Sequence, residues 1–319
     1  MSLMTIIYVG TQNGLYALSY ADRQWRAISL GLVGQNIIDL AVVGGSPATL
    51  YGVAKESGLY HTDNGGHSWR RIVSAKAHCL LVDETNARRL WLGLEPAGLL
   101  RSLDQAKSWQ DLTDKVQMVP GSADWSLAEP PYQAQMKVLA QMPGQANCLL
   151  AGIVEGDLLR SSDGGDTWAL SEAEESDIHA LAVQPAKPDF WLAAGQDGLY
   201  FSEDAGHTWA EVDDVFGYCS ALVIMSSGLC LVAVAPCPPG HWVENVATTL
   251  YQLTIEAGQW QITEYSFSDY IITLAVDQGT IYAGAQSGRV YLSEDGGQSW
   301  QQIADLAAGV NQLWIAGRS

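Results

Sequence analysis

Basic residues are scarce in this sequence. It has 16 lysines and arginines against 35 aspartates and glutamates, which gives a formal net charge of −19. A surface of this sign repels the phosphates of nucleic acids and of anionic membranes. We therefore expect neither nucleic acid nor membrane as a partner, and ligands that are neutral or cationic.

Cysteine pairs and long apolar runs are also missing. The five cysteines are odd in number and show no CxxC spacing, which favours buried free thiols over a disulfide framework or a zinc ribbon. No apolar run approaches the length of a membrane span, and no signal-peptide pattern precedes the strand-like residues 5–9. Residues 1–3, before Met4, resemble a cloning remnant. We expect a cytoplasmic protein, unless a native export signal is absent from this sequence.

A tryptophan recurs in one sequence context along almost the whole chain. Each copy follows two short runs rich in Leu, Tyr, Ala and Gly, and the copies are Trp25, Trp69, Trp109, Trp168, Trp209, Trp260 and Trp300. Intervals of roughly 40 to 60 residues, each with room for four short strands, are typical of propeller blades. The sequence therefore predicts an all-β fold, one seven-bladed β-propeller over residues 1–319.

The turn before the tryptophan has the pattern Ser-x-Asp-x-Gly-x-Thr/Ser-Trp. Three copies are complete, at 161–168, 202–209 and 293–300; Asn64 replaces the Asp in 62–69, and Ala106 replaces the Gly in 102–109. A short Asx side chain accepts backbone N–H bonds inside its own turn, and Gly supplies the positive φ. We assign a structural role to these Asx residues, which are Asn64, Asp104, Asp163, Asp204 and Asp295. A calcium loop would need more oxygen ligands at fixed offsets.

This repeat resembles the Asp-box (BNR) family, and the resemblance covers nearly the whole chain. The family includes sialidases, xyloglucan-degrading glycosidases, sortilin-like receptors and a photosystem II assembly factor, and the resemblance implies that the boxes are structural. Sialidases of the family use an arginine triad, but the ten arginines of this chain fall on outer strands, on the turns or, for Arg318, at the terminus. The xyloglucan-degrading relatives carry two propellers with a cleft between them. The assembly factor presents a basic patch, which this acidic sequence lacks.

Strand order within a blade assigns each loop to one of two faces. With strands A to D, blade 5 is expected at 178–184, 190–194, 199–202 and 208–212, and the repeated turns join C to D. B–C and D–A loops then share the opposite face, which we call the loop face; the C–D turns lie on the turn face. Residues 310–316 resemble 37–43 and are expected to complete blade 1 and close the ring. Two insertions, 111–135 and 235–247, fall on the loop face, where binding residues usually lie.

The loop face collects aromatic and acidic residues. A ring beside a hydrogen-bonding carboxylate can stack on a sugar, so we expect ligand contacts on this face. The candidates are Trp125, Tyr132, Tyr218, Tyr270, His241, Trp242 and Glu244, with the inserted loops forming one wall of an electronegative principal pocket. The alternative is that the acids are solvated and the aromatics anchor the loops.

Two further patterns bear on chemistry. A glycosidase needs two carboxylates roughly 5–9.5 Å apart, and the candidates near inner-strand ends or tight B–C turns are Glu56, Glu95, Glu155, Asp177, Asp197, Glu244 and Asp269. Aligned innermost strands place His78, Lys137, His179, Ser220 and Asn311 at equivalent positions, either lining the channel for a ligand or bonded to water and backbone. A zinc site from Cys219, Cys237 and His241 is a weaker interpretation than a stiff loop, and we expect no metal or cofactor.

These observations favour non-catalytic binding of a protein or glycan through the loop face, because no catalytic set stands out on a fold that hosts many functions. The alternative is a glycoside hydrolase or lyase, other than a sialidase, that acts on a neutral polysaccharide.

Overall fold

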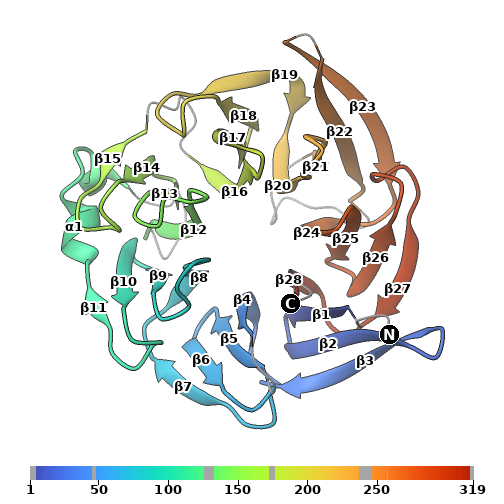
Figure 1. Cartoon of the computed structure of the whole chain (residues 1–319), viewed down its shortest axis with the longest axis horizontal. Helices are drawn as coiled ribbons and strands as arrows, with labels where there is room; N and C mark the ends of the chain where they lie inside the picture. Colours follow the sequence, from blue (N-terminus) through green and yellow to red (C-terminus); the bar gives the residue numbers. More distant parts are fainter. Residues whose placement is uncertain are drawn as a thin grey trace.

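The protein is a ring of seven four-stranded antiparallel sheets, as predicted (Figure 1). The computed structural model describes residues 5–44, 48–125, 133–171, 177–236, 246–256 and 258–316. Each sheet is one blade, and its first strand lies nearest the ring axis. Each blade except the first is built from four strands that follow one another in the sequence.

Within every blade the four strands succeed one another outward from the ring axis. Blade 1 is β28 (Val310–Ile315), β1 (Ile6–Thr11), β2 (Gly14–Ala21) and β3 (Gln24–Gly31); blade 2 is β4 (Ile37–Val43), β5 (Thr49–Ala54), β6 (Gly58–Thr62) and β7 (Arg70–Val73). Blade 3 is β8 (Ala77–Val82), β9 (Leu90–Leu94), β10 (Gly98–Ser102) and β11 (Gln110–Asp111); blade 4 is β12 (Gln135–Gln141), β13 (Leu149–Val154), β14 (Leu158–Ser161) and β15 (Ala169–Leu170). Blade 5 is β16 (Ile178–Gln184), β17 (Lys187–Gly195), β18 (Gly198–Ser202) and β19 (Ala210–Phe216). Blade 6 is β20 (Tyr218–Ile224), β21 (Cys230–Ala235), β22 (Thr248–Glu256) and β23 (Gln259–Phe267); blade 7 is β24 (Ile271–Asp277), β25 (Thr280–Ala285), β26 (Arg289–Ser293) and β27 (Gln301–Asp305).

The C–D turns satisfy their own polar groups within eight residues. In 161–168 the Ser161 hydroxyl donates to Asp163 Oδ1 at 2.9 Å and accepts the Gly165 N–H at 2.9 Å. Asp163 also accepts the Thr167 N–H at 2.8 Å and the Thr167 hydroxyl at 2.6 Å. Gly165 has φ 94°, a conformation that costs glycine little. The same bonds recur in 102–109 and 202–209, so the turn is a local, self-contained unit.

The core lies between neighbouring blades. Each inner strand carries one leucine of a ring that comprises Leu40, Leu80, Leu139, Leu181, Leu222, Leu274 and Leu313. Behind this ring, fully buried side chains such as Trp91 and Trp191 fill the space between sheets. The tryptophans of the C–D turns join these clusters: Trp168, for example, packs against buried residues of blades 3 and 4. Burying such large rings stabilises each interface between blades.

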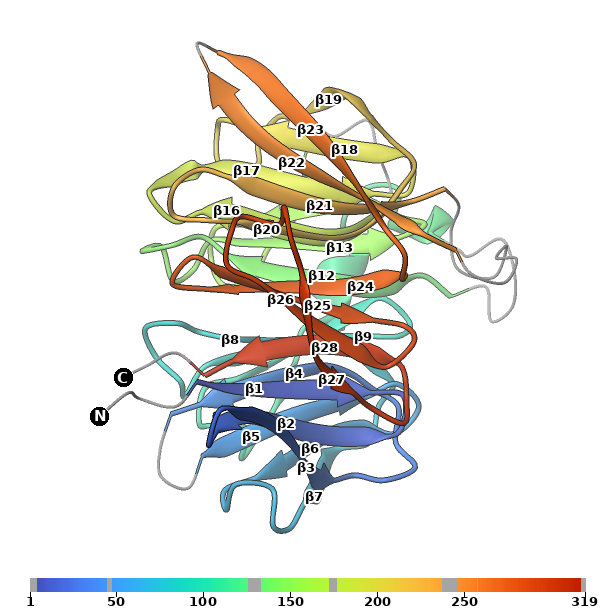
Figure 2. The same cartoon turned by 90° about the vertical axis from the view of Figure 1, so that its right-hand side faces the viewer.

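The chain ends and the first insertion have defined places in the ring. Strand β28 pairs antiparallel with β1, which places the two ends of the described chain in one blade (Figure 2). The insertion 111–135 carries a short helix α1 (Thr113–Gln117) and a 3-10 turn η1 (Ser122–Asp124), and follows the outermost strand of blade 3. In blade 5 two strands differ from the expected bounds. Strand β17 begins at 187 rather than 190, and β19 covers 210–216 rather than 208–212.

The short α1 is the single α-helix among the described residues, and no helix in that part of the chain is long and apolar enough to cross a membrane.

Candidate functional site

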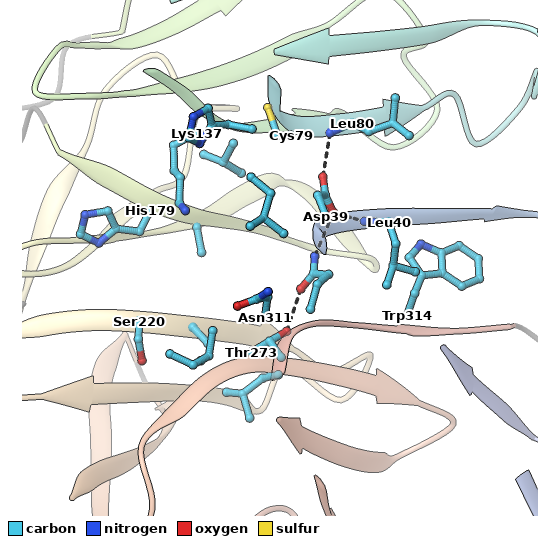
Figure 3. Close-up of a pocket in the computed structure, with 18 of the residues that line it drawn as sticks. Asp39, Leu40, Cys79, Leu80, Lys137, His179, Ser220, Thr273, Asn311 and Trp314 are labelled. Atoms are coloured by element: carbon cyan, nitrogen blue, oxygen red, sulfur yellow. Dashed lines mark hydrogen bonds between the residues drawn. The ribbon is translucent and has the colours of Figure 1, made fainter. Parts of the chain in front are cut away.

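The inner strands of the seven blades enclose a channel along the ring axis. Its cavity has a volume of about 820 Å³. All seven blades contribute to its lining, and Figure 3 shows part of it in close-up. The wall combines apolar side chains, among them seven leucines and three alanines, with polar ones. The polar side chains gather near the start of each inner strand, which is its loop-face end.

A β-bulge lies near that end of every inner strand. The pairing register between the innermost strand and its neighbour slips by one residue in each blade. A bulge re-aims the side chain that it leaves unpaired. The bulge residues, in blade order, are Asn311, Ile38, His78, Lys137, His179, Ser220 and Ile272, and all seven line the channel. The backbone therefore repeats seven times while the side chains differ.

His78 forms a buried pair with Glu95. Its Nε2 lies 2.7 Å from Glu95 Oε2, and both residues are less than a tenth exposed. Lys76 Nζ approaches Glu95 Oε1 at 3.7 Å and bonds exposed Glu56 at 3.0 Å. Burial lowers the pKa of His78 and outweighs Glu95, which raises it. Glu95, a candidate catalytic carboxylate, is thus hydrogen-bonded to His78 and helps to fix the position of its ring.

His179 repeats this arrangement two blades away. Its Nε2 lies 3.1 Å from Oδ1 of buried Asp177, and its ring stacks at 4.4 Å on the ring of Tyr218 from blade 6. Burial and the nearby Asp177 carboxylate raise the pKa of Tyr218. Among the described residues, no hydrogen-bond partner meets the buried Nδ1 of His179. Three sequence candidates therefore meet at one point of the channel wall.

Asp39 is a channel residue that the sequence analysis missed. Its carboxylate accepts the Leu80 N–H at 2.7 Å, the Leu40 N–H at 2.8 Å and a Gln312 Nε2–H at 3.2 Å (Figure 3). Gln312 in turn accepts the Thr273 hydroxyl at 2.8 Å, so the network joins four blades. Burial raises the pKa of Asp39 to about 6 against these hydrogen bonds. In the sequence, the feature that could have indicated Asp39 is that it is the single carboxylate in the apolar strand 37–43.

The other carboxylate candidates do not line the channel. Glu155 and Asp197 are exposed in B–C turns. Asp269 is buried, and it accepts the Tyr291 hydroxyl at 3.0 Å and the Ser287 hydroxyl, which ties it to blade 7. Tyr270 beside it is buried and does line the channel. No two of the described candidates face each other across this cavity.

The insertions are described in part. Trp125 is half-buried against the blade 4 core, and its indole N–H donates to Asp157 Oδ2 at 2.6 Å. It therefore anchors its loop, which was the alternative to a ligand platform. The remaining loop candidates Tyr132, His241, Trp242, Glu244 and Cys237 lie outside the described residues.

The described channel lining differs from the electronegative pocket expected from composition. Asp39 and Glu84 are its carboxylates, against the cations Lys55 and Lys137 and two histidines. The reason is that Glu95 and Asp177 turn toward histidines while Glu56, Glu155 and Asp197 face solvent. Within the described ranges, no group of three or more His, Cys, Asp or Glu side chains is arranged to hold a metal ion.

Comparisons with known proteins find one curated relative and several solved structures that share the fold. No family model matches it. It is 24% identical over 296 residues to the photosystem II assembly lipoprotein Ycf48 of Synechococcus, a match that spans 87% of this chain and 78% of that protein. A structure of Ycf48 bound to D1 peptide matches with a TM-score of 0.57 and 16% identity, covering 85% of this chain and 83% of that one.

Enzymes share the fold as well. The GH74 xyloglucanase from Xanthomonas campestris matches with a TM-score of 0.64 and 20% identity over 88% of this chain, and an ancestral GH74 enzyme with a TM-score of 0.65 and 16% identity over 93%. This chain spans less than half of either enzyme, 46% and 40% respectively. The likeness to these solved structures shows a shared propeller fold, in agreement with the seven sheets of this chain.

Proposed function

We propose that this chain binds a segment of another protein at the loop-face mouth of its channel, without catalysis. The observation that carries the proposal is the similarity to Ycf48, which extends over most of both chains. A Ycf48 structure holds a D1 peptide. A peptide is also the kind of ligand that suits a wide mouth whose wall changes chemistry from blade to blade.

The channel offers a peptide several kinds of contact. The Tyr218 ring, stacked on His179, presents an aromatic surface. Ser220 already donates to the Ile271 carbonyl at 2.7 Å, and Asn311 to the Ile37 carbonyl at 2.9 Å, so these two side chains hold neighbouring blades together. Peptide contacts therefore centre on blades 3 to 6. In this proposal the C–D turns are Asp-box (BNR) repeats that hold the scaffold rigid.

Catalysis by a carboxylate pair is less well supported. Glu95 and Asp177 each lie against a histidine, and the Asp39 oxygens already accept three donors. A general acid and a nucleophile need free access to the two sides of a glycosidic bond. Hydrolysis of a neutral polysaccharide remains the second candidate, favoured by the fold shared with GH74 enzymes.

The experiment is a binding assay paired with an activity assay. Fluorescence anisotropy would measure the affinity for the D1 peptide and then for peptides selected from a random display library. Tyr218→Ala and His179→Ala should weaken binding of the best peptide by about tenfold or more, the effect of truncating a central contact. Ser162→Ala, on an exposed C–D turn, is the matched control and should leave the affinity unchanged.

Two results would contradict the proposal. One is a library that yields no peptide sensitive to the Tyr218 and His179 variants. The other is release of reducing ends from xyloglucan that Glu95→Gln abolishes, since that would establish the enzyme.

A further inference from the structure

Lys137 places an ammonium group inside the channel, with no counter-ion bonded to it among the described residues. It is the bulge residue of blade 4 and is exposed to the channel rather than to the outer surface (Figure 3). Among the described residues it forms no hydrogen bond or ion pair. Desolvation by the channel walls lowers its pKa, and Lys55 lowers it further. The side chain is nevertheless exposed to solvent within the channel, so its ammonium is accessible to an anionic ligand.

The carboxylates nearest to Lys137 are committed elsewhere. Glu95 lies between His78 and Lys76, and Asp177 lies against His179. Asp39 acts on Lys137 from a distance, while two backbone N–H groups and Gln312 occupy its oxygens. These carboxylates already have partners, and Lys137 is left available to a ligand that enters the channel.

The surroundings favour a negative ligand in spite of the overall charge. The chain contains six lysines; Lys55 and Lys137 line the channel, whereas Lys76 at the same mouth is paired with Glu56 and Glu95. His78 and His179 flank Lys137 on the adjacent blades, and His179 Nδ1 has no partner among the described residues. A concave, partly dry site strengthens the field of such a cluster.

We propose that the channel mouth is a carboxylate-binding site in which Lys137 binds the anion and Lys55 and His179 assist. The cavity of about 820 Å³ has room for a side chain or chain end carrying that group. Because the proposal rests on the peptide-binding function, the carboxylate is assigned to the bound peptide, either an Asp or Glu side chain or the C-terminus. A small free carboxylate is the other source of the same chemistry.

The proposal predicts a pH dependence of binding. Lys137 faces Lys55 from blade 2, Asp39 from β4, His78 and Cys79 from β8, and Asp177 with His179 from β16. A bound carboxylate favours the ammonium form and raises the pKa of Lys137. Affinity is therefore lost as pH rises through the lowered pKa of Lys137 in the free protein.

Calorimetry and thermal unfolding with succinate as the probe test the site. Succinate should bind wild type and raise its melting temperature beyond the effect of sodium chloride at equal ionic strength. Lys137→Met, which keeps an unbranched side chain but removes the charge, should weaken succinate binding by about tenfold or more, the equivalent of one charged hydrogen bond. Lys187→Met makes the same change of net charge at an exposed lysine paired with Glu203, and should bind like wild type. Without ligand, the methionine variant at 137 should melt no lower than wild type, because an unpaired cation has been removed.

A second arm identifies the source of the carboxylate. The peptide selected from the display library would be compared as a free acid, as a C-terminal amide and with each acidic side chain replaced by its amide. Loss of affinity in one of these forms, and no further loss when it is tested on Lys137→Met, locates the bound carboxylate.

Failure of this inference differs from failure of the proposed function. Peptide binding that Lys137→Met leaves unchanged, or succinate binding equal in both lysine variants, overturns the carboxylate site while the peptide function stands. Succinate binding that depends on Lys137, in a protein that binds no peptide, supports the site and removes the peptide function.

Discussion

The polar C–D turn recurs in five of the seven blades and the bulge in all seven, but the two features differ in what is repeated. In the turns, backbone and side chains recur together: Ser102 with Asp104 and Ser293 with Asp295 make equivalent bonds at 2.9 and 2.8 Å. At the bulges the backbone recurs while the side chains include a lysine, two histidines and an isoleucine. The polar groups of the turns form hydrogen bonds within the turn, whereas Lys137 forms no hydrogen bond or ion pair among the described residues. The same polar side chains thus recur in the turns that stabilise the blades. The side chains differ from blade to blade at the bulges, where we propose the binding site.

Electrostatics separates the two regions as clearly as geometry does. Hydrogen bonds from Ser108 hold the pKa of Asp104 at about 2, and bonds from Ser299 do the same for Asp295. The channel carboxyl Asp39 has its pKa raised to about 6 because burial dominates. Hydrogen bonds within the turn thus stabilise the anionic form of Asp104 and Asp295, whereas burial in the channel wall destabilises the anionic form of Asp39.

The largest expected effect comes from removing the strand that joins the first and last blades. Deletion of residues 310–319 removes β28, leaves β1 with an unpaired edge and takes away one wall of the channel. We expect loss of cooperative unfolding and aggregation, measured by circular dichroism melts and size-exclusion chromatography. Deletion of residues 317–319 alone is the control. An unchanged melt after the longer deletion would show that the ring does not depend on β28.

A turn substitution should change stability and leave binding intact. Asp163→Ala removes the acceptor of the Thr167 N–H and hydroxyl, so the free energy of unfolding should fall by about 1–3 kcal/mol. Urea unfolding measures the change, and Ser162→Ala in the same turn should be near neutral. If the Asp163 variant folded normally but lost its peptide ligand, the division between the two regions would be wrong.

Asp39 predicts a pH effect of opposite sign to that of the turns. Its folded pKa of about 6 is raised from an ordinary 3.8, so the unfolded chain releases the proton first. The contribution of Asp39 to the free energy of unfolding is complete below pH about 4 and is lost as pH rises through about 6. The stability of wild type relative to Asp39→Asn should therefore decline between pH 4 and 6 and stay level above, by urea unfolding at each pH. A difference that increased over this range would refute the raised pKa.

The smallest effect on stability is expected from Tyr218→Phe. The ring that stacks on His179 is kept and the hydroxyl is lost, so the free energy of unfolding should change by no more than about 0.5 kcal/mol. Because Tyr218 lines the channel, peptide affinity should respond more than stability. Thermal melts and anisotropy on the same sample compare the two, and a large loss of stability with full affinity would reverse the assignment.

The sequence predicted the fold well because the fold signal is local. The recurring tryptophan and the Ser-x-Asp turn are set by residues within one blade, so the seven blades could be counted without knowing how they meet. The equivalence of His78, Lys137 and His179 also followed from the strand pattern. The bulges did not, since nothing local marks a register slip that depends on the partner strand.

The site was harder to predict because its contacts cross blades. Glu95 and Asp177 looked like free carboxylates, and only the structure brings a histidine to each. Asp39 depends on Leu80 and Gln312, which are far from it in sequence. Composition was limited in a similar way, because a net charge of −19 does not say where the six lysines lie in the fold.

The pairing of β28 with β1 also has a consequence for how the chain is made. During synthesis β1 emerges first and β28 last, so the inner edge of blade 1 has no partner until nearly all of the described chain exists. Contacts between such distant segments form slowly, since a very long loop must close before they add stability. In that interval the edge of β1 can pair with other strands. The nascent ring is therefore most vulnerable to misassembly just before its completion, at a strand that is well protected in the finished fold.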